Sequence, residues 1–126
     1  MIHLDTSALV DAFTGPRRSA RALRQLLERG ERIAVSALVL YEWRRGPRGE
    51  RELAHLEDLL PEAQAVPFGP REAVIAAELY RTVARAQQRE FDLAVAACAL
   101  ANAAGLWTLN VRDFEDIPGL ELVRAS

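Results

Sequence analysis

Short apolar segments alternate along the chain with longer segments that carry leucine or alanine at helical spacing. The expected strands are residues 2–4, 32–35, 65–68, 106–109 and 120–123. The expected helices are residues 6–13, 19–29, 36–43, 52–60, 72–88 and 91–104, with Gly30 expected to end the second and Ser36 to cap the start of the third. Short continuous apolar runs are typical of parallel strands buried on both faces, and such strands need helical crossovers between them. The pattern therefore predicts an α/β domain with a mainly parallel sheet covered by helices on both faces.

The composition fits one domain spanning residues 1–126 and excludes several kinds of chemistry. Hydrophobic residues make up 50% of the chain, which is enough for a packed core. The net charge of −2 gives no overall basic field. The sequence contains no lysine, so lysine nucleophiles, Schiff bases and P-loops are excluded. Cys98 is the only cysteine, which excludes an internal disulfide and a multi-cysteine zinc site.

The N-terminus and the apolar runs predict neither a signal peptide nor a membrane span. Residues 1–5 hold no positively charged segment ahead of an apolar one. No stretch approaches the roughly 18 uninterrupted apolar residues of a transmembrane helix. We therefore expect a cytoplasmic protein with no membrane partner.

Three aspartates occupy positions where a parallel sheet binds ligands. Asp5 ends the first expected strand, Asp113 follows the strand 106–109, and Asp92 opens the helix 91–104. Ligands of open parallel sheets bind outside the carboxyl ends of the strands. Each acid also has a structural alternative. Asp5 and Asp113 could cap the following helical turns, and Asp92 could favour a helix N-terminus through the dipole.

Glu42 is placed on an apolar face of its expected helix. Its neighbours three and four residues back are Val39 and Leu38. An unpaired carboxylate in such a position is costly, so Glu42 needs an arginine, a proton or a metal ion. An ion pair with Arg45 or another arginine is the structural alternative.

The predicted topology brings these four acids together at one edge of the sheet. Several carboxylates at close range cannot all stay ionised without a cation. Oxygen ligands without a histidine or cysteine cluster favour Mg²⁺ or Mn²⁺ over zinc. Such a metal would activate water and stabilise a phosphoryl transition state. The two histidines offer no general base, since His3 alternates with core residues in a strand and His55 lies on an exposed helix face.

Four short motifs carry a resemblance that spans essentially the whole chain. They are Asp-Thr-Ser at residues 5–7, Tyr-Glu-Trp at 41–43, Phe-Asp-Leu-Ala-Val-Ala-Ala at 91–97 and Thr-Leu-Asn-Val-Arg-Asp-Phe at 108–114. In order and spacing the chain resembles the PIN-domain ribonucleases, in particular the VapC-type toxins of bacterial and archaeal toxin–antitoxin pairs. Any one motif is weak, but the four together are specific.

The resemblance implies an α/β/α sandwich, an acidic Mg²⁺ or Mn²⁺ site and endonucleolytic cleavage of RNA. The family's acidic positions fall on Asp5, Glu42, Asp92 and Asp113. Its supporting polar positions fall on Thr6 or Ser7, Thr108 and Asn110. Asp116 could share the role of Asp113. The pattern is intact, so nothing marks the chain as an inactive member.

Other function classes must be compared with a ribonuclease. Two of them gather acids at strand ends, and a third keeps the fold without catalysis. A phosphoacceptor receiver needs a lysine, which the chain lacks, and an aspartate-nucleophile phosphatase expects an acid where Ser7 stands. A catalytically silent PIN-fold RNA-binding or scaffold module is the remaining alternative. Arginines after Glu42 could hold RNA phosphates, or they could form a solvated helix end: Arg44, Arg45 and Arg48.

Two protein partners are expected. Tyr41 and Trp43 flank Glu42, and the leucines of residues 53–60 offer more apolar surface than one small sheet can cover, which favours a homodimer. The resemblance implies a cognate antitoxin bound beside the active site. A basic side chain of that partner, most simply arginine, would pair with the acids, while an apolar groove would seat its amphipathic segment.

Overall fold

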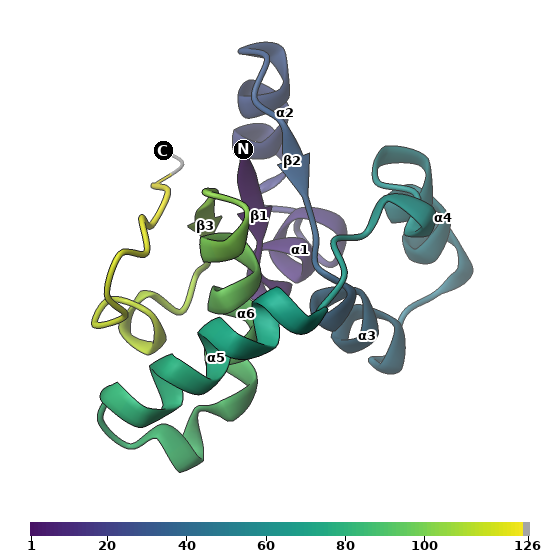
Figure 1. The fold of residues 1–126 in the computed structure, drawn as a ribbon. Helices are drawn as coiled ribbons and strands as arrows, with labels where there is room; N and C mark the ends of the chain where they lie inside the picture. The colour runs from purple at the N-terminus through teal and green to yellow at the C-terminus, as the bar shows by residue number, and fades with distance from the viewer. Residues whose placement is uncertain (125–126) are drawn as a thin grey trace.

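A three-stranded parallel sheet forms the centre of the computed structural model, which describes residues 1–124 (Figure 1). β1 (Ile2–Leu4) lies between β2 (Ile33–Ala34) and β3 (Gly105–Trp107). Both neighbours run parallel to β1. The predicted parallel α/β architecture is therefore confirmed.

The helices cover the sheet from two sides because the chain passes from β1 to β2 on one side and then crosses back over β1 to β3 on the other. The connection from β1 to β2 passes through α1 and α2, whereas β3 is reached through α6. Right-handed crossovers to opposite sides of the same strand place their helices on opposite faces. Figure 1 shows α5 alongside α6, and α1 on the other side of β1 next to α3. The carboxyl ends of β1 and β3 thus form the crevice at which such sheets bind ligands.

Residues 1–124 also form six α-helices and three short 3₁₀ turns. The α-helices are α1 (Thr6–Phe13), α2 (Ala20–Glu28), α3 (Ala37–Arg45), α4 (Glu50–Leu59), α5 (Pro70–Thr82) and α6 (Glu90–Ala101). The 3₁₀ turns are Glu62–Gln64, Ala86–Gln88 and Val111–Asp113. In the described part of the chain, none of the helices is both long and apolar enough to span a membrane.

Two helix ends follow the signals in the sequence. The Ser36 hydroxyl accepts a hydrogen bond from the Val39 amide at 3.2 Å, which caps the start of α3 as predicted. Gly30 follows α2 with φ at 82°, a left-handed conformation that glycine adopts without strain. The Glu31 amide bonds the Leu26 carbonyl, so the last turn of α2 closes in a Schellman motif.

The predicted strands 65–68 and 120–123 are wrong as strands, although both segments join the sheet. Each forms a single parallel bridge, Val66 to Ser36 and Leu122 to Leu106. The bridge at Val66 is not extended into a ladder, because its partner Ser36 is directly followed by the first residue of α3, Ala37. The strand predicted at 106–109 is also shifted, because β3 ends at Trp107.

The helix predicted over residues 72–88 is present but too long. α5 ends at Thr82, and Arg85 takes a left-handed conformation with φ at 54°. The Thr82 hydroxyl bonds back to the Glu78 carbonyl at 3.0 Å, and the β-branched Val83 follows it. Both features weaken a helix at this point. The helix predicted over 91–104 is also too long, since α6 ends at Ala101.

The core forms where the alanine-rich α6 meets the sheet. Ala96, Ala97 and Ala99 are fully buried, and their small side chains let the helix lie close to the strands. Leu106 and Trp43 are buried in the same core. Cys98 is buried and free, so it packs in the core as a small apolar residue.

His3 is buried in β1 at 2% exposure, which confirms that it is a packed rather than a surface residue. Burial, together with the positive charge of the N-terminus, lowers the pKa of His3 to about 4. Within the described residues its Nε2 atom has no hydrogen-bond partner. His55 is exposed on α4, as predicted.

The burial of His3 predicts a pH-dependent stability. The unfolded chain binds a proton at the ordinary histidine pKa of 6.5, while the folded chain binds it only near pH 4. The folded protein should therefore lose up to about 3 kcal/mol of stability from this residue as the pH falls from 6.5 to 4. Urea unfolding should show that the wild type loses more unfolding free energy between pH 6.5 and pH 4 than His3→Gln does. An equal loss in both proteins would contradict it, and the exposed His55→Gln is the control.

Candidate active site

The Asp5 carboxylate is buried at the carboxyl end of β1, with 5% of the residue exposed. Asp5 also stands at the N-cap position of α1, yet its side chain makes no capping hydrogen bond there. Two hydroxyls donate to the same oxygen, Oδ2: Ser7 Oγ at 3.0 Å and Thr108 Oγ1 at 2.7 Å. The carboxylate is therefore oriented towards the crevice between β1 and β3 and is not used as a helix cap.

Ser7 and Thr108 also fix the segment that follows β3. Their hydroxyl oxygens lie 3.2 Å apart. The Leu109 amide donates to Ser7 Oγ at 3.0 Å, and the Asn110 amide donates to Thr108 Oγ1 at 3.0 Å. The hydroxyls that hold Asp5 thus also hold the start of the 108–116 segment against α1.

Glu42 reaches the same region from α3. Thr6 Oγ1 donates to Glu42 Oε1 at 2.6 Å, so the two hydroxyls after Asp5 serve different acids. Arg45 Nη2 lies 3.5 Å from Glu42 Oε2, which is the ion pair considered as the structural alternative. Because the Arg45 side chain is largely exposed, this pair contributes little stability.

A cleft of about 460 Å³ joins three of the four predicted acids. Its lining residues are Asp5, Thr6, Ser7, Val10, Asp11, Glu42, Asp92, Leu109 and Asn110. Asp11 was not predicted as a site residue. Its position four residues after Ser7 on α1 places both on one helix face, which is a signal the sequence contains. Asp11 Oδ2 accepts a hydrogen bond from Ser19 Oγ at 2.5 Å.

Asp113 and Asp116 do not line this cleft. Asp113 ends the 3₁₀ turn after β3 and is exposed, although its charge acts on Asp92. Asp116 accepts two hydrogen bonds from Arg89, at 2.6 and 2.9 Å. These bonds and the arginine charge lower the pKa of Asp116. Asp116 is therefore engaged in an ion pair, whereas the charge of Asp113 acts on Asp92.

Burial and the crowding of these acids raise the pKa of Asp92. Partial burial and the charges of Asp5, Asp113 and Glu42 together raise the pKa of Asp92 to about 6. Arg89 acts in the opposite direction. A carboxyl whose charged form is disfavoured by its neighbours gains from a proton or a cation.

The acidic side chains of the cleft are of the type that binds hard divalent cations. Asp5, Glu42 and Asp92 supply only carboxylate oxygens, which Mg²⁺ and Mn²⁺ prefer. Among residues 1–124, no group of three acidic, histidine or cysteine side chains is already close enough to hold one ion. Binding would therefore need rotation of at least one carboxylate into the cleft.

The three arginines predicted to contact RNA differ in their surroundings. Arg44 pairs with Glu62 at 3.3 Å, and Arg45 pairs with Glu42. The Arg48 guanidinium lies 4.5 Å from the centre of the Trp43 ring. Arg48 is therefore packed on the core, while the first two are exposed at the end of α3.

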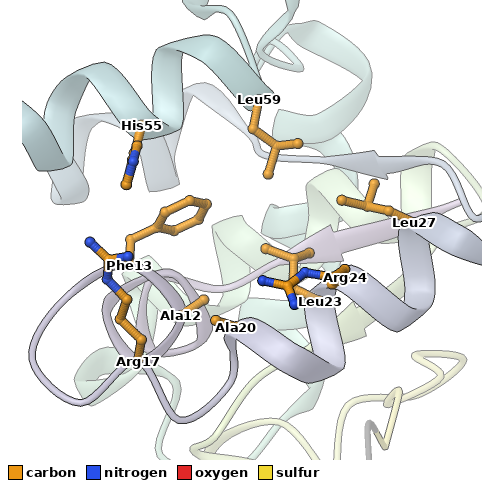
Figure 2. A pocket seen from close by; sticks show the side chains of 9 residues that line it. All are labelled: Ala12, Phe13, Arg17, Ala20, Leu23, Arg24, Leu27, His55 and Leu59. Atoms are coloured by element: carbon orange, nitrogen blue, oxygen red, sulfur yellow. The ribbon is translucent and has the colours of Figure 1, made fainter.

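A second pocket, of about 290 Å³, lies between α1, α2 and α4 (Figure 2). Figure 2 shows His55 and Leu59 of α4 facing Phe13 of α1, with Leu23 and Leu27 of α2 beyond it. Its remaining lining residues are Ala12, Arg17, Ala20 and Arg24. The pocket is thus an apolar groove that also carries two arginines.

This chain is similar to known proteins over nearly its whole length. The sequence pattern of the PIN domain family matches residues 2–120. Ribonuclease VapC19 of Mycobacterium tuberculosis is 36% identical over 121 residues, covering 94% of this chain and 95% of that protein. VapBC2 of Rickettsia felis, bound to a DNA fragment from its promoter, has a TM-score of 0.71 at 27% identity, with 98% of both chains covered. DNA-bound VapBC of Salmonella typhimurium has a TM-score of 0.76 at 21% identity, covering 97% and 96%.

The raised pKa of Asp92 predicts that Asp92→Asn stabilises the metal-free protein. Its folded pKa of about 6 lies above the ordinary value of 3.8, so charged Asp92 opposes folding increasingly from pH 4 to pH 6. The variant should gain on the order of 1–2 kcal/mol at pH 7, allowing for solvent screening, and nothing near pH 3.5. Urea unfolding at both pH values measures the gain. A variant less stable than the wild type at pH 7 would contradict the crowding of the acids.

Proposed function

The chain belongs to the PIN domain family, and from that premise we propose that it is a divalent-metal-dependent endoribonuclease, the toxin of a toxin–antitoxin pair. The observation that carries the proposal is the cleft at the carboxyl ends of β1 and β3, where Asp5, Glu42 and Asp92 meet. The ribonuclease named among the relatives, 36% identical over 94% of this chain, supports RNA as the substrate.

In this proposal Asp5, Glu42 and Asp92 hold Mg²⁺ or Mn²⁺, and Asp113 completes the site or orients water. The cation supplies Lewis-acid chemistry, which activates water and neutralises charge developing on the phosphate. Ser7 and Thr108 hold Asp5 in place through the two hydrogen bonds to Oδ2, and Thr6 holds Glu42. Asp92 binds a proton near pH 6, so metal and proton compete for its carboxylate.

The substrate phosphates are proposed to lie along the exposed end of α3. Arg44 and Arg45 are held by surface ion pairs that contribute little stability, so either could exchange its carboxylate partner for a phosphate. Arg48 was included in the same RNA-binding prediction. Its stacking on Trp43 favours a role in fixing the end of α3.

RNA cleavage tests the proposal. Purified protein should cut RNA with Mg²⁺ or Mn²⁺ and stop when EDTA is added. Asp5→Asn should lower the rate by at least about 100-fold, because it removes charge from the centre of the site. Asp58→Asn, which changes an exposed acid on α4, should keep the wild-type rate.

Two results would count against this account. Cleavage by Asp5→Asn at the wild-type rate would remove the site assignment. RNA binding without cleavage in either metal would favour the alternative, a catalytically silent RNA-binding or scaffold module.

We further propose that the groove between α1, α2 and α4 seats an apolar segment of the cognate antitoxin. Solved structures similar to this chain include VapBC toxin–antitoxin complexes, which supports a protein partner. The groove offers Phe13, Leu23 and Leu27 as an apolar floor, and Arg17 and Arg24 suit acidic residues of the partner. A basic side chain of the same partner would reach the acids of the cleft and compete with the cation.

Affinity for the antitoxin encoded beside the gene tests the groove. Leu27 is 37% exposed, so Leu27→Asp should leave the fold intact. The change should weaken binding by about 10–100-fold, because burial of one leucine side chain is worth about 1.5–3 kcal/mol. Val74→Asp, on α5 and 60% exposed, is the matched control. Equal affinity for both variants would place the partner elsewhere.

Two expectations stay predictions. The homodimer would use Tyr41, which is 60% exposed, whereas Trp43 and Leu56, which were expected to add to its apolar surface, are buried in the monomer. The cytoplasmic location rests on the sequence and on the likeness to VapC ribonucleases.

A further inference from the structure

Arg89 makes a dense set of hydrogen bonds just before α6, although it belongs to none of the four motifs. Its side chain is only 12% exposed. Nη1 donates to the Ala84 carbonyl at 3.0 Å and to Asp116 Oδ2 at 2.9 Å. Nη2 donates to the Asp113 carbonyl at 3.0 Å and to Asp116 Oδ1 at 2.6 Å. One guanidinium thus satisfies four acceptors on three residues.

These acceptors lie on segments far apart in the sequence. Ala84 belongs to the loop that follows α5, whereas Asp113 and Asp116 belong to the segment after β3. Arg89 itself directly precedes α6, three residues before Asp92. The guanidinium therefore ties the start of the helix that carries Asp92 to the turn that carries Asp113.

The segment from Thr108 to Asp116 is held at both ends by polar contacts. At its start, the amides of Leu109 and Asn110 donate to the Ser7 and Thr108 hydroxyls. At its end, Arg89 binds the Asp113 carbonyl and the Asp116 carboxylate. Asp113 belongs to the second attachment, so loss of the Arg89 contacts would free the turn on that side.

We propose that Arg89 is a positioning residue of the cleft, which fixes Asp113 relative to Asp92 by binding the Asp113 carbonyl with Asp116 as its counter-ion. Asp116 is then the partner that holds Arg89 in place and is not a fourth acid of the site. The inference rests on the proposed function, because it assigns Asp113 a role beside the acids of the cleft.

Arginine suits this task where lysine does not. Its planar fork can bind one carboxylate with two parallel hydrogen bonds and still donate to two backbone carbonyls. An ammonium is a single point donor group and cannot span the acceptors on Ala84, Asp113 and Asp116 together. Asp116 balances the charge, so Arg89 acts on the cleft through geometry more than through its own field.

A double-mutant cycle with Asp113 separates positioning from general stability. The proteins are the wild type, Arg89→Lys, Asp113→Asn and the double variant, each measured for RNA cleavage and for Mn²⁺ affinity by calorimetry. Arg89→Lys alone should lower kcat/KM about 10-fold and weaken Mn²⁺ binding. In the Asp113→Asn background the same change should cost less than about 2-fold, because the residue it positions is already inactive.

Additive losses in the two backgrounds would overturn the proposal, since they would show that Arg89 acts independently of Asp113. If Arg89→Lys does not fold, Asp116→Asn replaces it in the cycle. Its losses of kcat/KM and Mn²⁺ affinity should be smaller but should again nearly vanish in the Asp113→Asn background. Arg71→Met, which removes an exposed arginine paired with Glu72, should leave both readouts unchanged. A wild type that binds Mn²⁺ but cuts no RNA would contradict the proposed function alone, and the affinity cycle would still decide the role of Arg89. A wild type that does neither would overturn both.

Discussion

The buried carboxylate of Asp5 at the carboxyl end of the central strand is the constraint on which the rest of the site depends. A carboxylate this buried is costly unless its lone pairs are satisfied. The hydroxyls of Ser7 and Thr108 meet that need from α1 and from the segment after β3. The same two hydroxyls accept hydrogen bonds from the amides of Leu109 and Asn110. The groups that satisfy the Asp5 carboxylate therefore also fix the segment that follows β3.

The sheet order then explains why further acids gather there. Because β1 lies between β2 and β3, the helical connections to these two strands pass over opposite faces of the sheet. They leave the carboxyl end of β1 uncovered. α3 brings Glu42 to this opening and the first turn of α6 brings Asp92. The neighbouring negative charges raise the pKa of Asp92 to about 6 once burial has disfavoured its charged form. The fold therefore maintains a destabilising concentration of charge that a divalent cation would relieve.

The sequence predicted the parts of this arrangement that follow from periodicity and strand ends. It placed Asp5, Glu42 and Asp92 together and identified Ser36 as a helix cap. It could not show that residues 65–68 form a single bridge, because apolar content alone does not distinguish a bridge from a ladder. The break after Thr82 depends on local side-chain to backbone bonding, and the role of Arg89 depends on contacts with residues up to 27 positions away. Such long-range pairings leave no periodic signal.

The central claim is that these carboxylates form one cation site, and anomalous diffraction from crystals soaked in Mn²⁺ tests it most directly. The account predicts a manganese peak in the cleft with oxygens of Asp5 and Asp92 as ligands, reached by rotation of side chains on an unchanged backbone. Crystals soaked at saturating Mn²⁺ that show no peak between Asp5 and Asp92, or a peak bound only by other residues, would contradict it.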